Sequence, residues 1–216
     1  SNEIKNATLE NVRVRDAVIT NQSSQVGGLA GIVQGSILKR ISIENVTIKA
    51  GDTIGGLAGQ FDGTLLENCL VTGNLEGTLR HQMGARVGGV TGWQGGGVLK
   101  NCVTKVEISA PARTGNGGII GGPASGSAAI QNSVSLSTGA NAGRIAGWDV
   151  LGGSSNVYEL ETSDSETNIH AGNDTLLFLV TEEQAGTDAF YTDTLGWSPE
   201  VWDFDGLTVG GTPALR

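Results

Sequence analysis

Short apolar segments alternate with turns rich in Gly, Asn, Ser and Asp along the first 160 residues of the chain. Residues 10–14 and 44–48 alternate polar and apolar side chains with a period of two, which is typical of a half-buried strand. These stretches lack the helical patterns of about 10–15 residues that alternate with strands in βαβ proteins. The pattern therefore predicts an all-β protein.

A six-residue glycine motif recurs five times in phase with these segments. The intervals between the first glycines of successive copies are 28, 33, 29 and 26 residues. Three strands of five residues with three turns of four need roughly 27 residues, so one repeat is long enough for one coil. We expect residues 1–160 to form a parallel β-solenoid of about five coils, with a β-sandwich as the rival architecture. The copies are VGGLAG at 26–31, IGGLAG at 54–59, VGGVTG at 87–92, NGGIIG at 116–121 and AGRIAG at 142–147.

Stacking of the coils accounts for the residues of this motif. The fourth position is Leu, Ile or Val in every copy, which predicts that it faces the core. The period of two places Gly55 on the same inward face as Leu57 and turns Gly56 outward. We therefore expect Val to be tolerated better at Gly56 than at Gly55, since a glycine on the inward face lets the opposite wall approach the backbone.

A second block, centred on an asparagine, keeps the same phase. We expect its amide side chains to stack from coil to coil and to bond along the ladder or to turn backbone. Asn156 belongs to a truncated copy, and Arg40 stands where the other copies have Asn. The full copies are at residues 4–7, 66–69, 99–102 and 130–133.

The glycine copies at 26–31, 54–59 and 87–92, each followed by an asparagine block, resemble GLUG repeats. GLUG repeats occur in bacterial surface and secreted proteins, including adhesin-like proteins. They also occur in the non-catalytic part of the immunoglobulin-A-protease family of zinc metallopeptidases. Residues 195–215 are similar to the stretch that closes such repeats. The resemblance implies a secreted or bacterial cell-surface location and a glycoprotein or polysaccharide partner.

The last part of the chain, residues 161–216, has a different pattern and forms a second predicted unit. Residues 159–174 are acidic and read as an exposed loop. The spacing of Thr181 and Gln184 is that of a capping box, which predicts a short helix over about 182–190. We interpret the aromatic residues as the core of a small C-terminal cap that covers the open end of the solenoid, rather than as a sugar-stacking platform. These residues are Trp148, Phe190, Tyr191, Trp197, Trp202 and Phe204.

Composition and charge exclude several classes of protein. Gly is 35 of 216 residues without a G-X-Y period, which excludes collagen. Residues 1–150 carry 12 Lys+Arg and 10 Asp+Glu, whereas residues 151–216 carry 1 and 12, giving the net charge of −9. Neither part offers the basic surface that nucleic acids or anionic membranes require. No apolar run approaches the length of about 18 residues needed for a membrane-spanning helix.

The candidate chemistry is sparse. The two histidines, His81 and His170, are far apart, and the chain has no His-Glu-x-x-His motif. Cys69 and Cys102 share one phase in adjacent coils, which favours free, buried, stacked thiols. Glu10 and Glu44 share a phase before Asn, but the other acids of the coils, Asp52, Asp62, Glu67, Glu76 and Glu107, fall mostly on different phases. We predict no catalytic residues, no metal site and no cofactor, and the pattern assigns no binding residues.

Three functions fit these observations. The first is a non-catalytic structural or interaction module of a bacterial surface or secreted protein, in adhesion or as a spacer. The second is an accessory domain that positions host glycoproteins for a secreted zinc metallopeptidase. The third is a carbohydrate-active β-helix, which needs two carboxyl groups about 5–10 Å apart.

Overall fold

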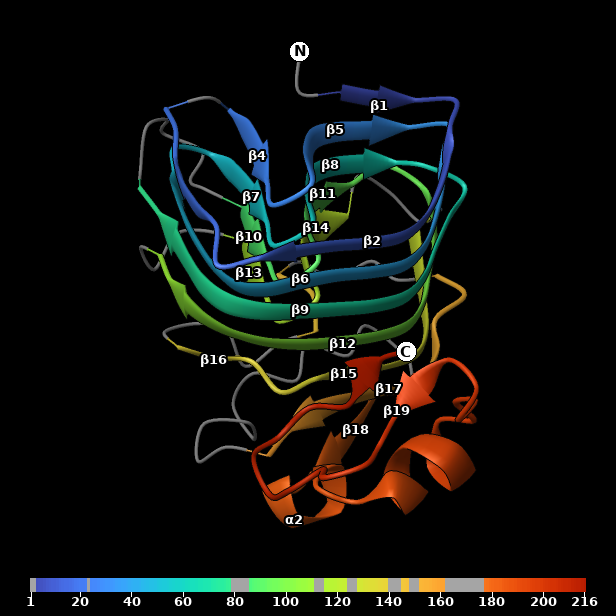
Figure 1. The fold of residues 1–216 in the computed structure, drawn as a ribbon. Helices are drawn as coiled ribbons and strands as arrows, with labels where there is room; N and C mark the ends of the chain where they lie inside the picture. The colour runs from blue at the N-terminus through green and yellow to red at the C-terminus, as the bar shows by residue number, and fades with distance from the viewer. Residues whose placement is uncertain are drawn as a thin grey trace.

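The chain folds as an all-β protein in which parallel sheets form a β-solenoid of about four turns (Figure 1). The computed structural model describes residues 3–22, 24–78, 86–110, 115–123, 128–139, 145–147, 152–161 and 177–216. The predicted fold class is confirmed, with fewer turns than the five expected. Of the fifth glycine copy, only residues 145–147 are described, and there Ala146 forms a parallel bridge with Ile120.

Three sheets line the solenoid, and each turn contributes a strand to each (Figure 1). The short sheet contains β4 (Gln25–Gly27), β7 (Thr53–Gly55), β10 (Arg86–Gly88) and β13 (Gly115–Gly117). The middle sheet contains β1 (Glu3–Lys5), β5 (Ala30–Gln34), β8 (Ala58–Asp62), β11 (Thr91–Gln94) and β14 (Ile120–Pro123). The long sheet contains β2 (Thr8–Arg15), β3 (Val18–Thr20), β6 (Ile37–Ala50), β9 (Leu65–Gly77), β12 (Gly97–Ser109), β15 (Ala128–Ser135), β16 (Thr138–Gly139), β17 (Ser155–Leu160) and β18 (Leu177–Val180).

The glycine motif stacks in register, as the sequence predicts. Val26 pairs with Ile54, and Ile54 pairs with Val87. The Leu57 amide donates to the Val90 carbonyl at 2.9 Å, and the same bond recurs between the fourth-position residues of the neighbouring copies. Leu57 and Val90 are fully buried in the core, which confirms the predicted facing of the fourth position.

The motif forms the turn between the short and middle sheets, and both glycines before the fourth position are tightly packed. A side chain on Gly55 would overlap the carbonyl of Ala58. A side chain on Gly56 would overlap the carbonyl of Gly89 and the side chain of Val71, which belongs to the long sheet opposite. The prediction that Gly56 faces outward is wrong, because this turn dips inward and meets the long sheet. We therefore expect Val to disrupt the fold at either position.

A ladder of residues in the left-handed conformation runs through the long sheet. The φ angles of Asn68 and Asn101 are 57° and 53°, and Asn101 Nδ2 donates to Asn68 Oδ1 at 3.1 Å. Asn156 Nδ2 likewise donates to Asn132 Oδ1 at 3.2 Å. Asn tolerates this conformation because its short polar side chain bonds locally. The predicted amide stacking is confirmed, and the members of this asparagine ladder are Asn11, Arg40, Asn68, Asn101, Asn132 and Asn156.

The register corrects two sequence alignments of the first coils. Leu9 pairs with Leu38 and Val12 with Ile41, so residues 9–12, and not 4–7, are the first copy of the asparagine block. Glu10 pairs with Lys39, whereas Glu44 pairs with Arg15. Glu10 and Glu44 therefore do not share a phase as expected, because Asn45 occupies a separate left-handed corner beside Asp16.

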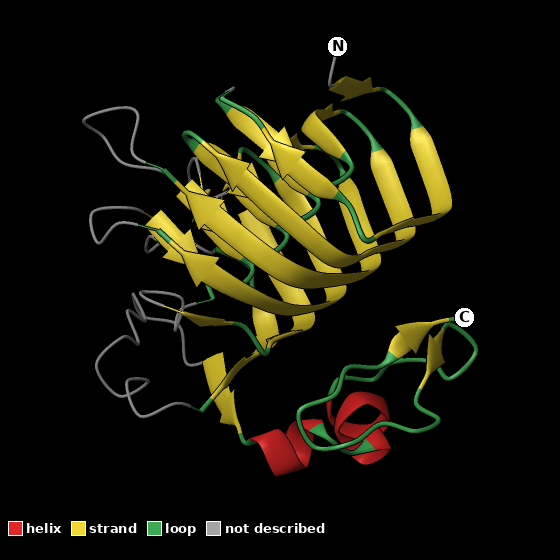
Figure 2. Ribbon diagram, turned by 60° about the vertical axis from the view of Figure 1, so that its left-hand side comes forward, coloured by secondary structure: helices red, strands yellow, loops and turns green. Residues whose placement is uncertain are grey.

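The C-terminal segment packs along the outside of the solenoid. β18 adds the last strand to the long sheet, and the following residues, 181–216, fold back over its outer face (Figure 2). We call residues 181–216 the brace. Thr181 forms the predicted capping box with Gln184, but the α-helix is shorter than expected. The brace contains α2 (Glu182–Ala185), the π-helix η1 (Phe190–Thr194), β19 (Trp202–Asp203) and β20 (Ala214–Leu215).

Polar and apolar contacts fix the brace across successive turns. Trp197 Nε1 donates to the Asn132 carbonyl at 2.9 Å, and Trp202 Nε1 donates to Asn68 Oδ1 at 3.3 Å. Near the end of the chain, Arg13 Nη2 donates to the Leu215 carbonyl at 2.9 Å. The aromatic residues thus form a core, as predicted, but the core lies against the side of the solenoid instead of over its end. Its members from the long sheet include Leu70, Val103 and Val134.

The asparagine ladder gives a first prediction. We expect Asn101→Ala to lower the free energy of unfolding by about 1–3 kcal/mol, because Ala loses the amide bond and fits a positive φ poorly. Asn101→Gly should lose less, since Gly adopts this φ without strain. Urea unfolding of both variants measures the difference. Equal losses of unfolding free energy in the two variants would show that the left-handed conformation at position 101 does not affect stability.

The brace gives a second prediction. A fragment of residues 1–180 should aggregate in size-exclusion chromatography, because Leu70, Val103 and Val134 would face water. Replacing these three residues by Thr in the fragment should restore a monomer. A fragment that stays monomeric without the replacements, at an unchanged melting temperature, would contradict the stabilising role of the brace.

Candidate functional site

The two cysteines are free and buried, as the sequence predicts. Cys69 pairs with Cys102 in the long sheet, and each thiol lies near the carbonyl two residues earlier, at 3.6 Å from Glu67 O and 3.4 Å from Lys100 O. Burial above all, together with the neighbouring Cys102 thiol, raises the pKa of Cys69. A buried thiol with a raised pKa is a poor nucleophile, so Cys69 serves packing.

Four acidic side chains of the coils are paired with basic ones from adjacent turns, and they are Glu10, Glu44, Glu67 and Glu76. Glu67 lies 3.7 Å from both Lys39 and Lys100, and Lys49 pairs with Glu76. Within the described residues, no group of three or more His, Cys, Asp or Glu side chains could hold a metal ion. His81, His170, Trp148 and residues 162–174 of the predicted acidic loop lie outside the described residues.

A groove of about 560 Å³ lies between the last strands of the long sheet and the start of the brace. Tyr158 and Phe190 line it, with their rings edge-on at 5.2 Å between centroids. Phe178, which is not part of the lining, stacks on Tyr158 at 5.1 Å. We call this hollow the aromatic groove. Polar side chains line it beside these rings, and they are Glu183, Gln184, Thr187, Asp193 and Thr194. An apolar floor with a few polar groups is the usual construction of a ligand site.

The sequence does not predict this groove, because Tyr158 and Phe178 are not among the aromatic residues that it assigns to the cap core. That assignment holds for Tyr191, Trp197 and Trp202, which are 0–2% exposed. Phe178 differs, since 42% of it is exposed. The signal in the sequence was the apolar run before Thr181, which continues the long sheet by one more strand.

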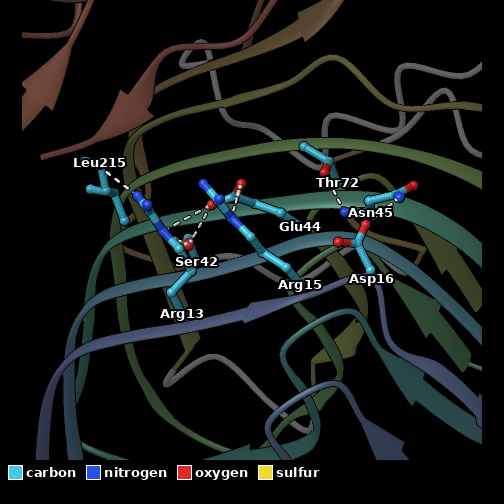
Figure 3. A network of polar contacts seen from close by, with 8 residues as sticks. All are labelled: Arg13, Arg15, Asp16, Ser42, Glu44, Asn45, Thr72 and Leu215. Carbon is cyan, nitrogen blue, oxygen red and sulfur yellow. Dashed lines mark hydrogen bonds and ion pairs between the residues drawn. The ribbon is translucent and has the colours of Figure 1, made fainter.

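A second hollow, of about 280 Å³, lies where the end of the brace meets the first two strands of the long sheet. Arg13 is central to the polar network at this place (Figure 3). Its Nε donates to Ser42 Oγ at 3.1 Å and lies 3.2 Å from Glu44 Oε1, while Arg15 Nε donates to Glu44 Oε2 at 3.0 Å. We call this hollow the arginine pocket, and it is lined by Asn11, Val12, Arg13, Arg40, Ser42, Leu215 and Arg216.

Comparisons with known proteins give no match. The chain matches no known protein family, no curated protein and no solved structure. In the part of the chain that the structure describes, neither short helix of the brace has the length or the apolar character needed to cross a membrane. The two hollows are therefore the features of the molecule that point to a function.

The cysteine pair gives a third prediction. The pKa of Cys69 is raised in the folded state, so the protonated thiol is favoured there. The corresponding stability is complete below the unfolded pKa of about 8.5 and is lost as the pH rises above it. We expect urea unfolding to show a smaller free energy at pH 9.5 than at pH 7. The decrease should be smaller in Cys69→Ala, and an equal decrease in both proteins would contradict the assignment.

Proposed function

We propose that this chain is a non-catalytic interaction module of a bacterial cell-surface or secreted protein, built from GLUG-type repeats and acting in adhesion. The aromatic groove is the observation that carries this proposal, and its ligand is the carbohydrate of a polysaccharide or glycoprotein. A sugar ring presents an apolar face to aromatic rings and hydroxyl groups to polar side chains. The groove offers both kinds of partner around Tyr158.

The rigidity of the wall supports a binding role. Tyr158 belongs to β17, which is paired with β15 on one side and β18 on the other. The brace side of the groove is anchored by Trp197 and Trp202, whose rings stack at 4.4 Å. A site held on such elements loses little conformational entropy when a ligand binds.

An accessory role in a zinc metallopeptidase would use the same surface. In that case the groove would hold the glycan of a glycoprotein while another domain cuts the polypeptide. The two roles differ in the kind of domain that comes after this module in the parent protein. A downstream His-Glu-x-x-His motif favours the accessory role, and further repeats favour adhesion.

A carbohydrate-active β-helix is a second candidate function. Glu183 and Asp193 both line the aromatic groove, and paired carboxyl groups flank the cleaved bond in most glycoside hydrolases. In the coils, Glu10, Glu44, Glu67 and Glu76 form ion pairs with basic residues of neighbouring turns. A reducing-end assay on a panel of polysaccharides separates the two functions, since binding without new reducing ends favours adhesion and new reducing ends favour catalysis.

Filling the groove gives a fourth prediction. Ala189 is exposed and lines the groove, so Ala189→Trp should block the ligand without removing a packed side chain. We expect the affinity for bound polysaccharides to fall roughly tenfold or more, which is about 1.4 kcal/mol. Glu200→Trp adds the same ring at an exposed place outside the groove and serves as the control. If no polysaccharide or glycoprotein binds to the chain, or both variants bind alike, the proposal is wrong.

A further inference from the structure

Arg40 interrupts the asparagine ladder at a position where the backbone disfavours it. Its φ is 53°, close to the 57° and 53° of Asn68 and Asn101. Asn adopts this conformation readily, whereas a long side chain such as Arg does so rarely. An unfavourable residue in a strained conformation is commonly kept for a role other than folding.

The Arg40 side chain extends into the arginine pocket. Its Nε donates to Asn11 Oδ1 at 2.6 Å, and its Nη2 donates to Glu10 Oε2 at 2.8 Å. These bonds hold the guanidinium over the neighbouring strand, where it lines the pocket together with Arg13 and Arg216.

The other two guanidinium groups are held by the brace. Arg13 Nη2 donates to the Leu215 carbonyl at 2.9 Å (Figure 3). Arg216 Nε donates to the Trp202 carbonyl at 3.1 Å, and its Nη2 donates to Asp203 Oδ1 at 3.2 Å. Three cationic groups from the first strand, the second strand and the end of the brace thus meet around one hollow.

The pocket brings three guanidinium groups together although the chain carries a net charge of −9. Its seven residues include three arginines and no Asp or Glu. Each arginine has one carboxylate partner, Glu10, Glu44 or Asp203, which does not line the hollow. The guanidinium fork matches the geometry of carboxylate, sulfate and phosphate oxygens. A volume of about 280 Å³ leaves room for such a group with part of the molecule that carries it.

We propose that the arginine pocket binds the anionic substituent, a carboxylate or a sulfate ester, of an acidic saccharide. The convergence of three guanidinium groups on one hollow is the observation that points to an oxyanion. The choice of a saccharide as the carrier of this group rests on the proposed function, which gives the same protein a glycan-binding groove. Arg40, which takes the place of Asn at the second position of the asparagine ladder, supplies one of the three guanidinium groups for this ligand.

The test is calorimetric titration with a uronic acid tetramer, its carboxyl-reduced neutral counterpart and inorganic sulfate. The full chain carries Ala189→Trp, so that the aromatic groove does not contribute. We expect the uronic acid tetramer to bind and the neutral tetramer not to bind. Arg40→Asn should lower the affinity for the uronic acid tetramer and for sulfate by roughly tenfold to a hundredfold, which is the loss expected for a charge-assisted hydrogen bond.

Urea unfolding of the same variants separates binding from folding. Arg40→Asn should be at least as stable as the parent, because Asn restores the ladder residue. Lys49→Asn removes a cation from the same strand, β6, outside the pocket, and should retain tetramer affinity.

Equal tetramer binding by the parent and Arg40→Asn would overturn the proposal, and so would equal binding of the neutral tetramer. Sulfate binding that depends on Arg40, without any tetramer binding, would overturn the saccharide and leave the oxyanion. The proposed function is tested by a separate measurement. That measurement compares polysaccharide binding by Ala189→Trp and by Glu200→Trp, each made in the otherwise unchanged chain.

Discussion

Parallel pairing between successive turns is the interaction on which the structure depends. Each turn bonds to the turns above and below it through backbone groups, at a strand spacing of about 4.8 Å. Residues that stack at equivalent positions of successive turns, which we call a column, must therefore fit the same space in every turn. This constraint explains the inward-dipping turn, where Gly55 and Gly56 leave no room for a side chain between coils or against Val71. It also explains why the corner in the long sheet keeps one backbone conformation from Asn11 to Asn156.

The same constraint decides what the sequence could predict. The glycine period, the paired cysteines and the inward Leu57 all follow from columns of like residues, and the structure confirms them. The alignment of Glu10 with Glu44 fails because the strings around Asn11 and Asn45 look alike but form two different corners. A short stretch of sequence predicts the backbone conformation of a corner, but the pairing register depends on the number of residues in one whole turn of the solenoid. One turn spans 29 residues between Asn11 and Arg40.

The position of the brace was hidden from the sequence for a related reason. One outward column of the long sheet changes from Arg13 and Ser42 in the first strands to Leu70, Val103 and Val134 in the later ones. This change marks where the brace covers the sheet, so that β9, β12 and β15 are buried on both faces around Leu70, Val103 and Val134. The column can be read only after the register is known. Without it, the aromatic residues could be assigned to a core but not to a place on the solenoid.

Both candidate sites arise where the brace meets the long sheet, one near its start and one at its end. The aromatic groove forms beside β17 and β18, and the arginine pocket forms beside β2 and β6. Five strand spacings of about 4.8 Å separate β2 from β17, so the sites lie roughly 24 Å apart along the stack. A rigid wall keeps this separation fixed. A long saccharide bound at one site would then meet the other at a high effective concentration, and two weak sites could hold one chain firmly.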